Sequence, residues 1–150
     1  MAVKSKTNPI LVLLVSLVLL CTAFIFSNSL KDSAASHADS DVIVGVVEKV
    51  ADRIKPGNGL DWSYIVRKGA HLFEFFVLGT LTMILSECIE RRRWRAIIYA
   101  LLYVLAVASA DEFIQSFTGR TSSFTDVLID MLGAVIGIGL VMLMRLFLLE

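Results

Sequence analysis

The sequence predicts an all-α membrane protein, built as a four-transmembrane-helix bundle, and three observations support this prediction. Of the 150 residues, 57% are apolar and the mean hydropathy is +0.77, too high for an ordinary soluble domain or a disordered chain. The apolar residues form four blocks, each close to the length that crosses a hydrocarbon core of roughly 30 Å. Because these blocks use most of the chain, no large soluble core remains, and residues 1–150 are predicted to form a single membrane domain.

The first predicted span, residues 9–28, contains no charged side chain. Lys4 and Lys6 precede it as in a signal peptide, but the apolar stretch is longer than usual and no small-residue cleavage site follows. We therefore expect an uncleaved anchor. Cys21 and Cys88 lack the spacing of a disulfide or metal site, so both are interpreted as packing residues.

The other predicted spans cover residues 66–86, 94–115 and 124–145. The last contains Gly133 and Gly137, a G-x-x-x-G pair typical of closely packed membrane helices. The four spans together indicate a multi-pass protein of the bacterial cytoplasmic membrane.

Positive charges in the short loops predict the orientation, because Lys and Arg are retained on the cytoplasmic side. They lie before the first span, between the second and third, and after the fourth, at Lys4, Lys6, Arg91, Arg92, Arg93, Arg95 and Arg145. Both termini are therefore predicted to be cytoplasmic, with residues 27–68 and the turn at Gly119 outside. The 14 basic and 14 acidic side chains balance, which gives no basic field for nucleic acid.

The first outer loop is predicted to contain an amphipathic helix at residues 41–54. Its apolar residues recur at helical spacing opposite charged ones, and they are Ile43, Val46, Val47, Val50 and Ile54. Such a helix is expected at the outer membrane surface or over the mouth of the bundle.

Polar residues of three spans are predicted to converge at one depth. His71 and Glu74 share a face of the second span, and Asp126 and Asp130 share a face of the fourth. At about 1.5 Å per residue, Glu74 and Asp130 each lie about 9 Å below the outer surface. The end of the third span adds further polar groups, so the predicted outward-facing pocket contains His71, Glu74, Asp111, Glu112, Gln115, Arg120, Asp126 and Asp130.

Ionisable residues inside a span are costly, by about 2.5–3.5 kcal/mol each on insertion scales, and so indicate function by default. The five carboxylates of this set repel one another, so some must be protonated, paired with a cation or bound to a metal.

The residues near the membrane surface also have structural interpretations. Asp126 follows Ser123 at the spacing of a capping box. Arg67 and Lys68 could simply flank the membrane.

The deeper residues have structural alternatives of their own. Asp111 and Glu112 could solvate a helix end, and His71 could be a packed, hydrogen-bonded histidine. Glu74 and Asp130 have no capping role, so an interhelical polar network is their structural alternative.

These motifs resemble the VanZ-like family of small bacterial membrane proteins over roughly residues 26–139. Residues 67–76, RKGAHLFEFF, resemble the family's R-K-x-x-H-x-x-E-aromatic motif, and DEFIQ at 111–115 with Gly119-Arg120 resembles its D-E-x-x-Q…G-R motif. The serine-rich start at 26–29 resembles its first outer loop, and its final helix is matched by Asp126, Asp130, Gly133 and Gly137.

Three positions depart from the family pattern. Phe75 replaces a frequent tyrosine, Thr118 a frequent proline, and Asp130 stands where asparagine is also common. An asparagine at that position puts a strict carboxylate role for Asp130 in doubt.

The resemblance implies a role in the cell envelope, and the family's namesake is associated with low-level resistance to the glycopeptide teicoplanin. The first hypothesis is therefore a protein that acts on, or binds, a lipid-linked envelope precursor or a lipophilic glycopeptide. In an enzymatic version the catalytic candidates are His71, Glu74, Asp111, Glu112, Gln115 and Asp130, and the substrate-binding candidates are Arg67, Lys68, Arg120 and Asp126. No serine or cysteine nucleophile lies among the motif residues, which favours acid–base or metal chemistry. If a divalent metal binds, its predicted ligands are His71, Glu74 and Asp130.

Two other functions fit the same pattern. A non-catalytic protein could shield a drug's lipid tail or a precursor head group. A small proton-coupled transporter is the third hypothesis, although a carrier needs its ionisable site near the midplane, and these residues lie nearer one surface. Membrane lipids are the expected partners, whereas catalysis, metal content and oligomeric state stay open.

The orientation can be tested by fusing reporters active in the periplasm or the cytoplasm at Arg92 and at Gly119. We expect cytoplasmic activity at Arg92 and periplasmic activity at Gly119, because the arginine-rich loop is retained inside. Periplasmic activity at Arg92 would place the polar residues in the inner leaflet and contradict the outward-facing site.

Overall fold

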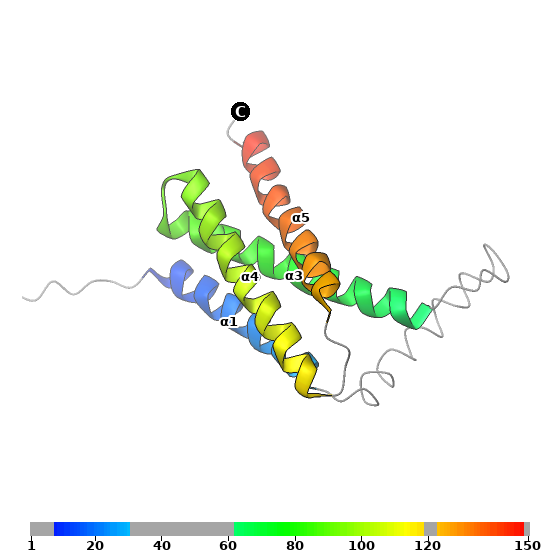
Figure 1. The fold of residues 1–150 in the computed structure, drawn as a ribbon. Helices are drawn as coiled ribbons and strands as arrows, with labels where there is room; N and C mark the ends of the chain where they lie inside the picture. The colour runs from blue at the N-terminus through cyan, green and yellow to red at the C-terminus, as the bar shows by residue number, and fades with distance from the viewer. Residues whose placement is uncertain (1–7, 31–61, 119–122, 149–150) are drawn as a thin grey trace, which may run out of the picture.

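The computed structural model describes residues 8–30, 62–118 and 123–148 (Figure 1). Its helices are α1 (Pro9–Ser29), α3 (Trp62–Ile89), α4 (Arg93–Phe117) and α5 (Phe124–Leu148), and the described residues form no strand. All four helices are long and apolar enough to cross a membrane. The predicted all-α, four-span fold is therefore confirmed, and each predicted span lies within one of these helices. The predicted amphipathic helix at 41–54 and Arg120 lie outside the described residues.

The start of α1 follows from local sequence chemistry. Proline suits the first helical position, where its missing N–H would have no partner, and Pro9 occupies it. The side chain of Asn8 accepts a hydrogen bond from the backbone N–H of Ile10 at 3.1 Å and so caps the helix.

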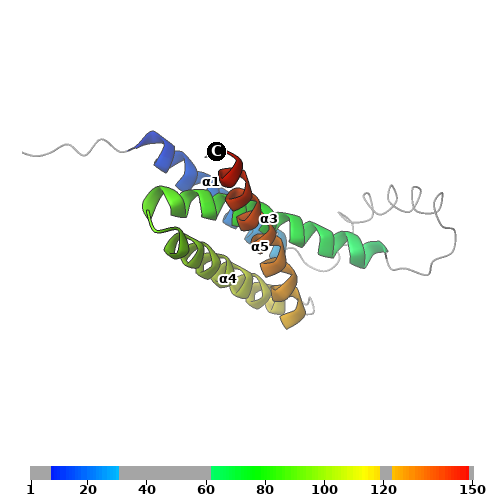
Figure 2. The same cartoon turned by 90° about the horizontal axis from the view of Figure 1, so that it is seen from above.

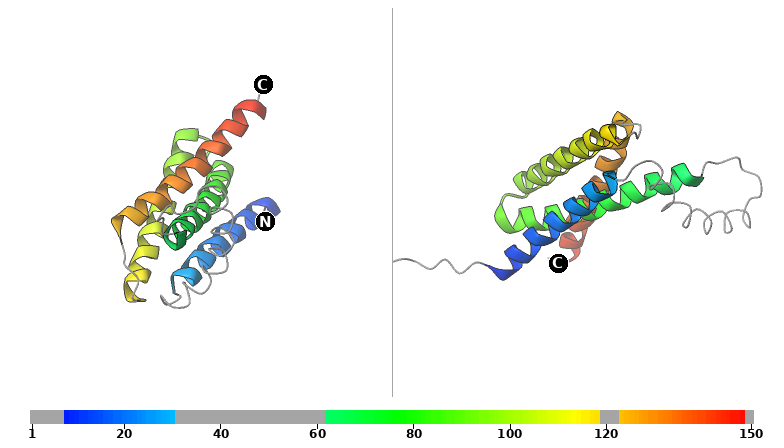
Figure 3. Two further views of the ribbon diagram at one scale, coloured as in Figure 1. Left: turned by 90° about the vertical axis from the view of Figure 1, so that its right-hand side faces the viewer. Right: turned by 90° about the horizontal axis from the view of Figure 1, so that it is seen from below.

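The helices alternate in direction: α1 and α4 run toward one end of the bundle, and α3 and α5 run toward the other. The start of α1, the connection between α3 and α4, and the end of α5 are at the same end of the bundle, where the end of α5 projects away from α1, and the opposite ends of α1, α4 and α5 lie nearer one another (Figures 1 and 3). The N-terminal turns of α3 extend beyond the other helices at this second end (Figure 1). Both α3 and α4 contact all the other helices.

The outer surface of the bundle is largely apolar. Exposed leucine, isoleucine and phenylalanine side chains occur along every helix, such as Leu20 in α1, Phe73 in α3, Leu102 in α4 and Leu132 in α5. In water this surface would drive aggregation, whereas in a bilayer it contacts lipid tails. The protein is thus a multi-pass membrane protein.

The closest packing in the bundle is between α3 and α5, which run in the same direction and cross steeply (Figures 1 and 2). A Cβ atom added at Gly133 would meet the carbonyl oxygen of Leu72, and one added at Gly137 would meet that of Phe76. On the facing side, a Cβ atom added at Gly79 of α3 would lie 2.6 Å from the backbone of Ala134 on α5. Glycine is therefore required on both helices for their backbones to touch.

A matched pair of substitutions tests this contact. We expect Gly133→Ala to destabilise the purified protein by about 1–3 kcal/mol, because the added methyl forces the helices apart. Gly139 has open space at its Cβ position, so Gly139→Ala should leave the thermal unfolding midpoint in detergent near that of the wild type. Equal midpoints for the two variants would show that the helices do not approach as described.

Candidate functional site

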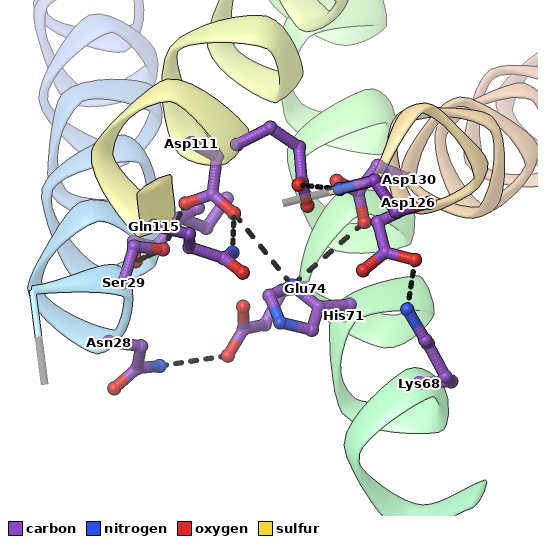
Figure 4. A network of polar contacts seen from close by, with 12 residues as sticks. Asn28, Ser29, Lys68, His71, Glu74, Asp111, Gln115, Asp126 and Asp130 are labelled. Carbon is purple, nitrogen blue, oxygen red and sulfur yellow. Dashed lines mark hydrogen bonds and ion pairs between the residues drawn. The ribbon is translucent and has the colours of Figure 1, made fainter. Parts of the chain in front are cut away.

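Polar side chains of all four helices meet where the end of α1, the first half of α3, the end of α4 and the start of α5 come together (Figure 4). The convergence predicted from the sequence is present for the residues that the structure describes. Buried polar residues here are Ser29, Asp111, Glu112, Gln115 and Asp130.

At the centre, the imidazole of His71 lies between two aspartates from different helices (Figure 4). Its Nδ1 atom is 4.0 Å from Oδ2 of Asp111 on α4 and 3.9 Å from Oδ1 of Asp130 on α5. One ligand atom from each of these residues lies within 4.8 Å of the others. We call these three residues the central triad.

Asp111 is held in place from two sides. The hydroxyl of Ser29, at the end of α1, donates to its Oδ1 atom. The amide of Gln115, one turn later on α4, donates to Oδ2 at 2.7 Å. Both donors and the carboxylate are buried, so the orientation of Asp111 is fixed by hydrogen bonds in a low-dielectric environment.

Asp130 is the exception in this network. Its side chain is 1% exposed, yet neither carboxylate oxygen has a hydrogen-bond partner among the described residues. The 3.9 Å separation from His71 is too long for a hydrogen bond. A buried carboxylate without such partners costs stability, so this residue is the strongest sign that the site serves a ligand.

Glu74 also contributes to the cluster, from the same helix as His71. One of its carboxylate oxygens accepts a hydrogen bond from the Asn28 side chain on α1, at 2.8 Å. The group of potential metal ligands contains Asp111 in the place that the sequence analysis gave to Glu74.

The cationic residues at the start of α3 differ in their contacts. Lys68 pairs with Asp126 at the start of α5, and both side chains are mostly buried. Arg67 makes no hydrogen bond or ion pair with the residues that the structure describes. Of the two, Lys68 is therefore the one that joins the cluster.

Glu112 caps the start of α5 across the bundle. Its Oε2 atom accepts from the backbone N–H of Ser123 at 2.8 Å, and the Ser123 hydroxyl accepts from the N–H of Thr125 at 3.2 Å. Because Asp126 pairs with Lys68 instead, Ser123 and Asp126 do not form the reciprocal capping box that their spacing allows.

Asn28 and Ser29 are site residues that the sequence analysis did not identify, because the serine-rich stretch suggested a loop. The helix continues to Ser29, and the buried residues of α1 are Val18, Ile25 and Ser29. Spacings of seven and four residues put these three on one helix face. Burial in the structure, and not the sequence pattern, identifies Ser29, because apolar residues occupy every face of α1.

The opposite end of the bundle carries a different kind of polar contact. Arg145 of α5 forms an ion pair with Glu87 on α3, with 2.8 Å between Nε and Oε2. Glu90 and Arg95 form a looser pair at 3.8 Å beside the α3–α4 connection. Each of these carboxylates therefore has an arginine as its counterion.

The fold and the cluster together define a small polytopic helical membrane protein with a carboxylate–histidine site inside its bundle. The sequence profile described as VanZ/LLP1 matches residues 10–145, nearly the whole chain. The chain belongs to the VanZ/LLP1 family, which confirms the resemblance and the location in the cell membrane. No curated protein and no solved structure matched the chain.

The unequal hydrogen bonding of the two aspartates leads to a stability prediction. We expect Asp130→Asn to raise the unfolding midpoint, because a neutral amide costs less to bury without partners than a carboxylate. Asp111→Asn should lower stability by about 1–3 kcal/mol, because one of its two donors then faces an NH₂ group. The measurement is thermal unfolding in detergent with EDTA present, and the reverse ranking would contradict this description of the site.

Proposed function

We propose that this protein binds the polar head group of a lipid-anchored envelope molecule at its polar cluster, in the outer leaflet of the membrane. The observation that carries the proposal is Asp130, a fully buried carboxylate to which none of the residues that the structure describes donates a hydrogen bond. Its cost is hard to explain as packing, since glycine and alanine neighbours on α5 already bring the helices together.

The position of the cluster supports a lipid-anchored ligand. Asp111 lies six residues before the end of α4 and Asp130 six residues after the start of α5, so the triad lies about 9 Å inside one end of the bundle, within reach of a head group that enters from that end. Lys68 and Arg67 lie toward the projecting start of α3, where a cation can hold a phosphate. A lipid-linked envelope precursor fits this arrangement, and a lipophilic glycopeptide of the teicoplanin class is the second ligand consistent with the family.

The chemistry of the cluster favours acid–base or ion-assisted action over a covalent acyl intermediate. Ser29 is the hydroxyl nearest the triad, but it is fully buried and donates to Asp111 rather than to His71. A serine nucleophile needs a neighbouring base and access to substrate, and Ser29 lacks access. His71, with 14% of its side chain exposed, is the group that can exchange a proton with a bound molecule.

Envelope composition tests the proposal. In a strain that lacks the chromosomal copy, we expect plasmid-borne Asp130→Asn and Glu74→Gln to give the lipid-precursor profile and glycopeptide susceptibility of the deletion. Glu87→Gln is the matched control, because it removes a comparably buried carboxylate from α3 at the far end of the bundle. Wild-type precursor profiles together with wild-type glycopeptide susceptibility in both site variants, at equal membrane levels, would overturn the proposal.

The size of the effect separates catalysis from binding. Complete loss of the wild-type phenotype from each single substitution indicates catalysis, since removing a catalytic group typically lowers the rate by roughly 10²-fold or more. A glycopeptide susceptibility between those of the wild type and the deletion, with an unchanged precursor profile, indicates a protein that binds or shields its ligand.

A further inference from the structure

We infer that the central triad, His71, Asp111 and Asp130, is a binding site for one divalent transition-metal ion, Zn²⁺ or Mn²⁺. This inference deepens the proposed function, since it names an ion at the same site. The presence of the ion does not depend on the proposed function, but its role in binding a head group does.

The geometry of the triad suits a metal better than a direct ion pair. Two atoms that bind one Zn²⁺ at roughly 2.1 Å in a tetrahedral site lie about 3.4 Å apart. The distances from His71 Nδ1 to the two aspartates, 4.0 and 3.9 Å, exceed this by only about half an ångström. The same distances are too long for hydrogen bonds from the imidazole, so a protonated His71 in this position would leave Asp130 unsatisfied.

The burial of Asp130 is the independent observation that points to a ligand. Its side chain is 1% exposed and is directed at His71, and within residues 8–30, 62–118 and 123–148 neither oxygen accepts a hydrogen bond. A divalent ion, two carboxylates and a neutral imidazole form an assembly with no net charge, which is much less costly to bury than separate charges.

The surroundings of Asp111 are those expected of a metal ligand's supporting shell. Ligating carboxylates are usually hydrogen-bonded by neighbouring groups that orient them. Ser29 and Gln115 do this from α1 and α4.

The donor set selects the class of ion. One imidazole nitrogen with two carboxylate oxygens is suited to Zn²⁺ or Mn²⁺. Ca²⁺ takes roughly six to eight oxygen ligands, and the triad offers no sulfur atom to a thiolate-seeking ion. Three protein ligands leave coordination positions open, which an anionic head group or a water molecule can occupy.

The test uses the full chain in lipid nanodiscs, stripped with EDTA and then titrated with Zn²⁺, Mn²⁺ or Mg²⁺ by calorimetry. We expect about one Zn²⁺ or Mn²⁺ per chain, a loss of affinity of at least about 10-fold in His71→Gln and Asp130→Asn, and a loss of about 10-fold in Ser29→Ala. Mg²⁺ should bind more weakly, because imidazole is a poor ligand for it.

Glu74→Gln is the decisive companion variant, because Glu74 shares a helix face with His71 but lies outside the triad. Its loss of metal affinity should be clearly smaller than that of His71→Gln, because it removes a neighbouring charge but no ligand atom. A loss in Glu74→Gln as large as that in His71→Gln, or an equal loss in Glu87→Gln, would overturn the assignment of the ligands.

Absence of saturable binding by the folded wild-type protein would overturn the inference while leaving the envelope proposal intact. Saturable metal binding by a protein whose site variants still complement the deletion would support the metal site and overturn the envelope proposal. Circular dichroism and a single size-exclusion peak identify the variants that are folded.

Discussion

The backbone contact between α3 and α5 is the constraint on which the rest of the structure depends. Apolar side chains do not drive membrane helices together, because lipid tails solvate them equally well, so close association needs small residues and direct packing. Gly79, Gly133 and Gly137 provide this contact on both helices. The crossing places residue 72 of α3 beside residue 133 of α5, and it thereby sets His71 and Asp130, one and three residues earlier, at 3.9 Å.

This rigid crossing explains how a costly group survives inside the membrane. Asp111 is satisfied by Ser29 and Gln115, whereas Asp130 is held beside His71 without a hydrogen bond of its own. A loosely packed helix would rotate such a carboxylate toward the surface, but the glycine contact leaves α5 no room to do so. The site therefore keeps an unsatisfied acceptor ready for a ligand, and stability is lost in exchange for function, as at many binding sites.

The sequence was sufficient for the four spans and for the convergence of polar residues at one end, because apolar blocks and alternating helix direction determine both. It was not sufficient for the partners within the cluster. The i, i+3 spacing puts His71 and Glu74 on one face but leaves the rotation of α4 undefined, so Asp111 could not be recognised as the residue opposite His71. Ser29 was hidden for a related reason, since the end of α1 is helical in a stretch whose serines suggest a loop.

An experimental structure of the full chain in lipid nanodiscs, solved after adding Zn²⁺, tests this account most directly. The account predicts that the backbones of α3 and α5 touch at Leu72 and Gly133, and that His71 Nδ1 lies within about 4 Å of Asp130, with metal density among the three triad side chains. Lipid or side chains between the two helices at Gly133, with His71 turned away from Asp130, would contradict it.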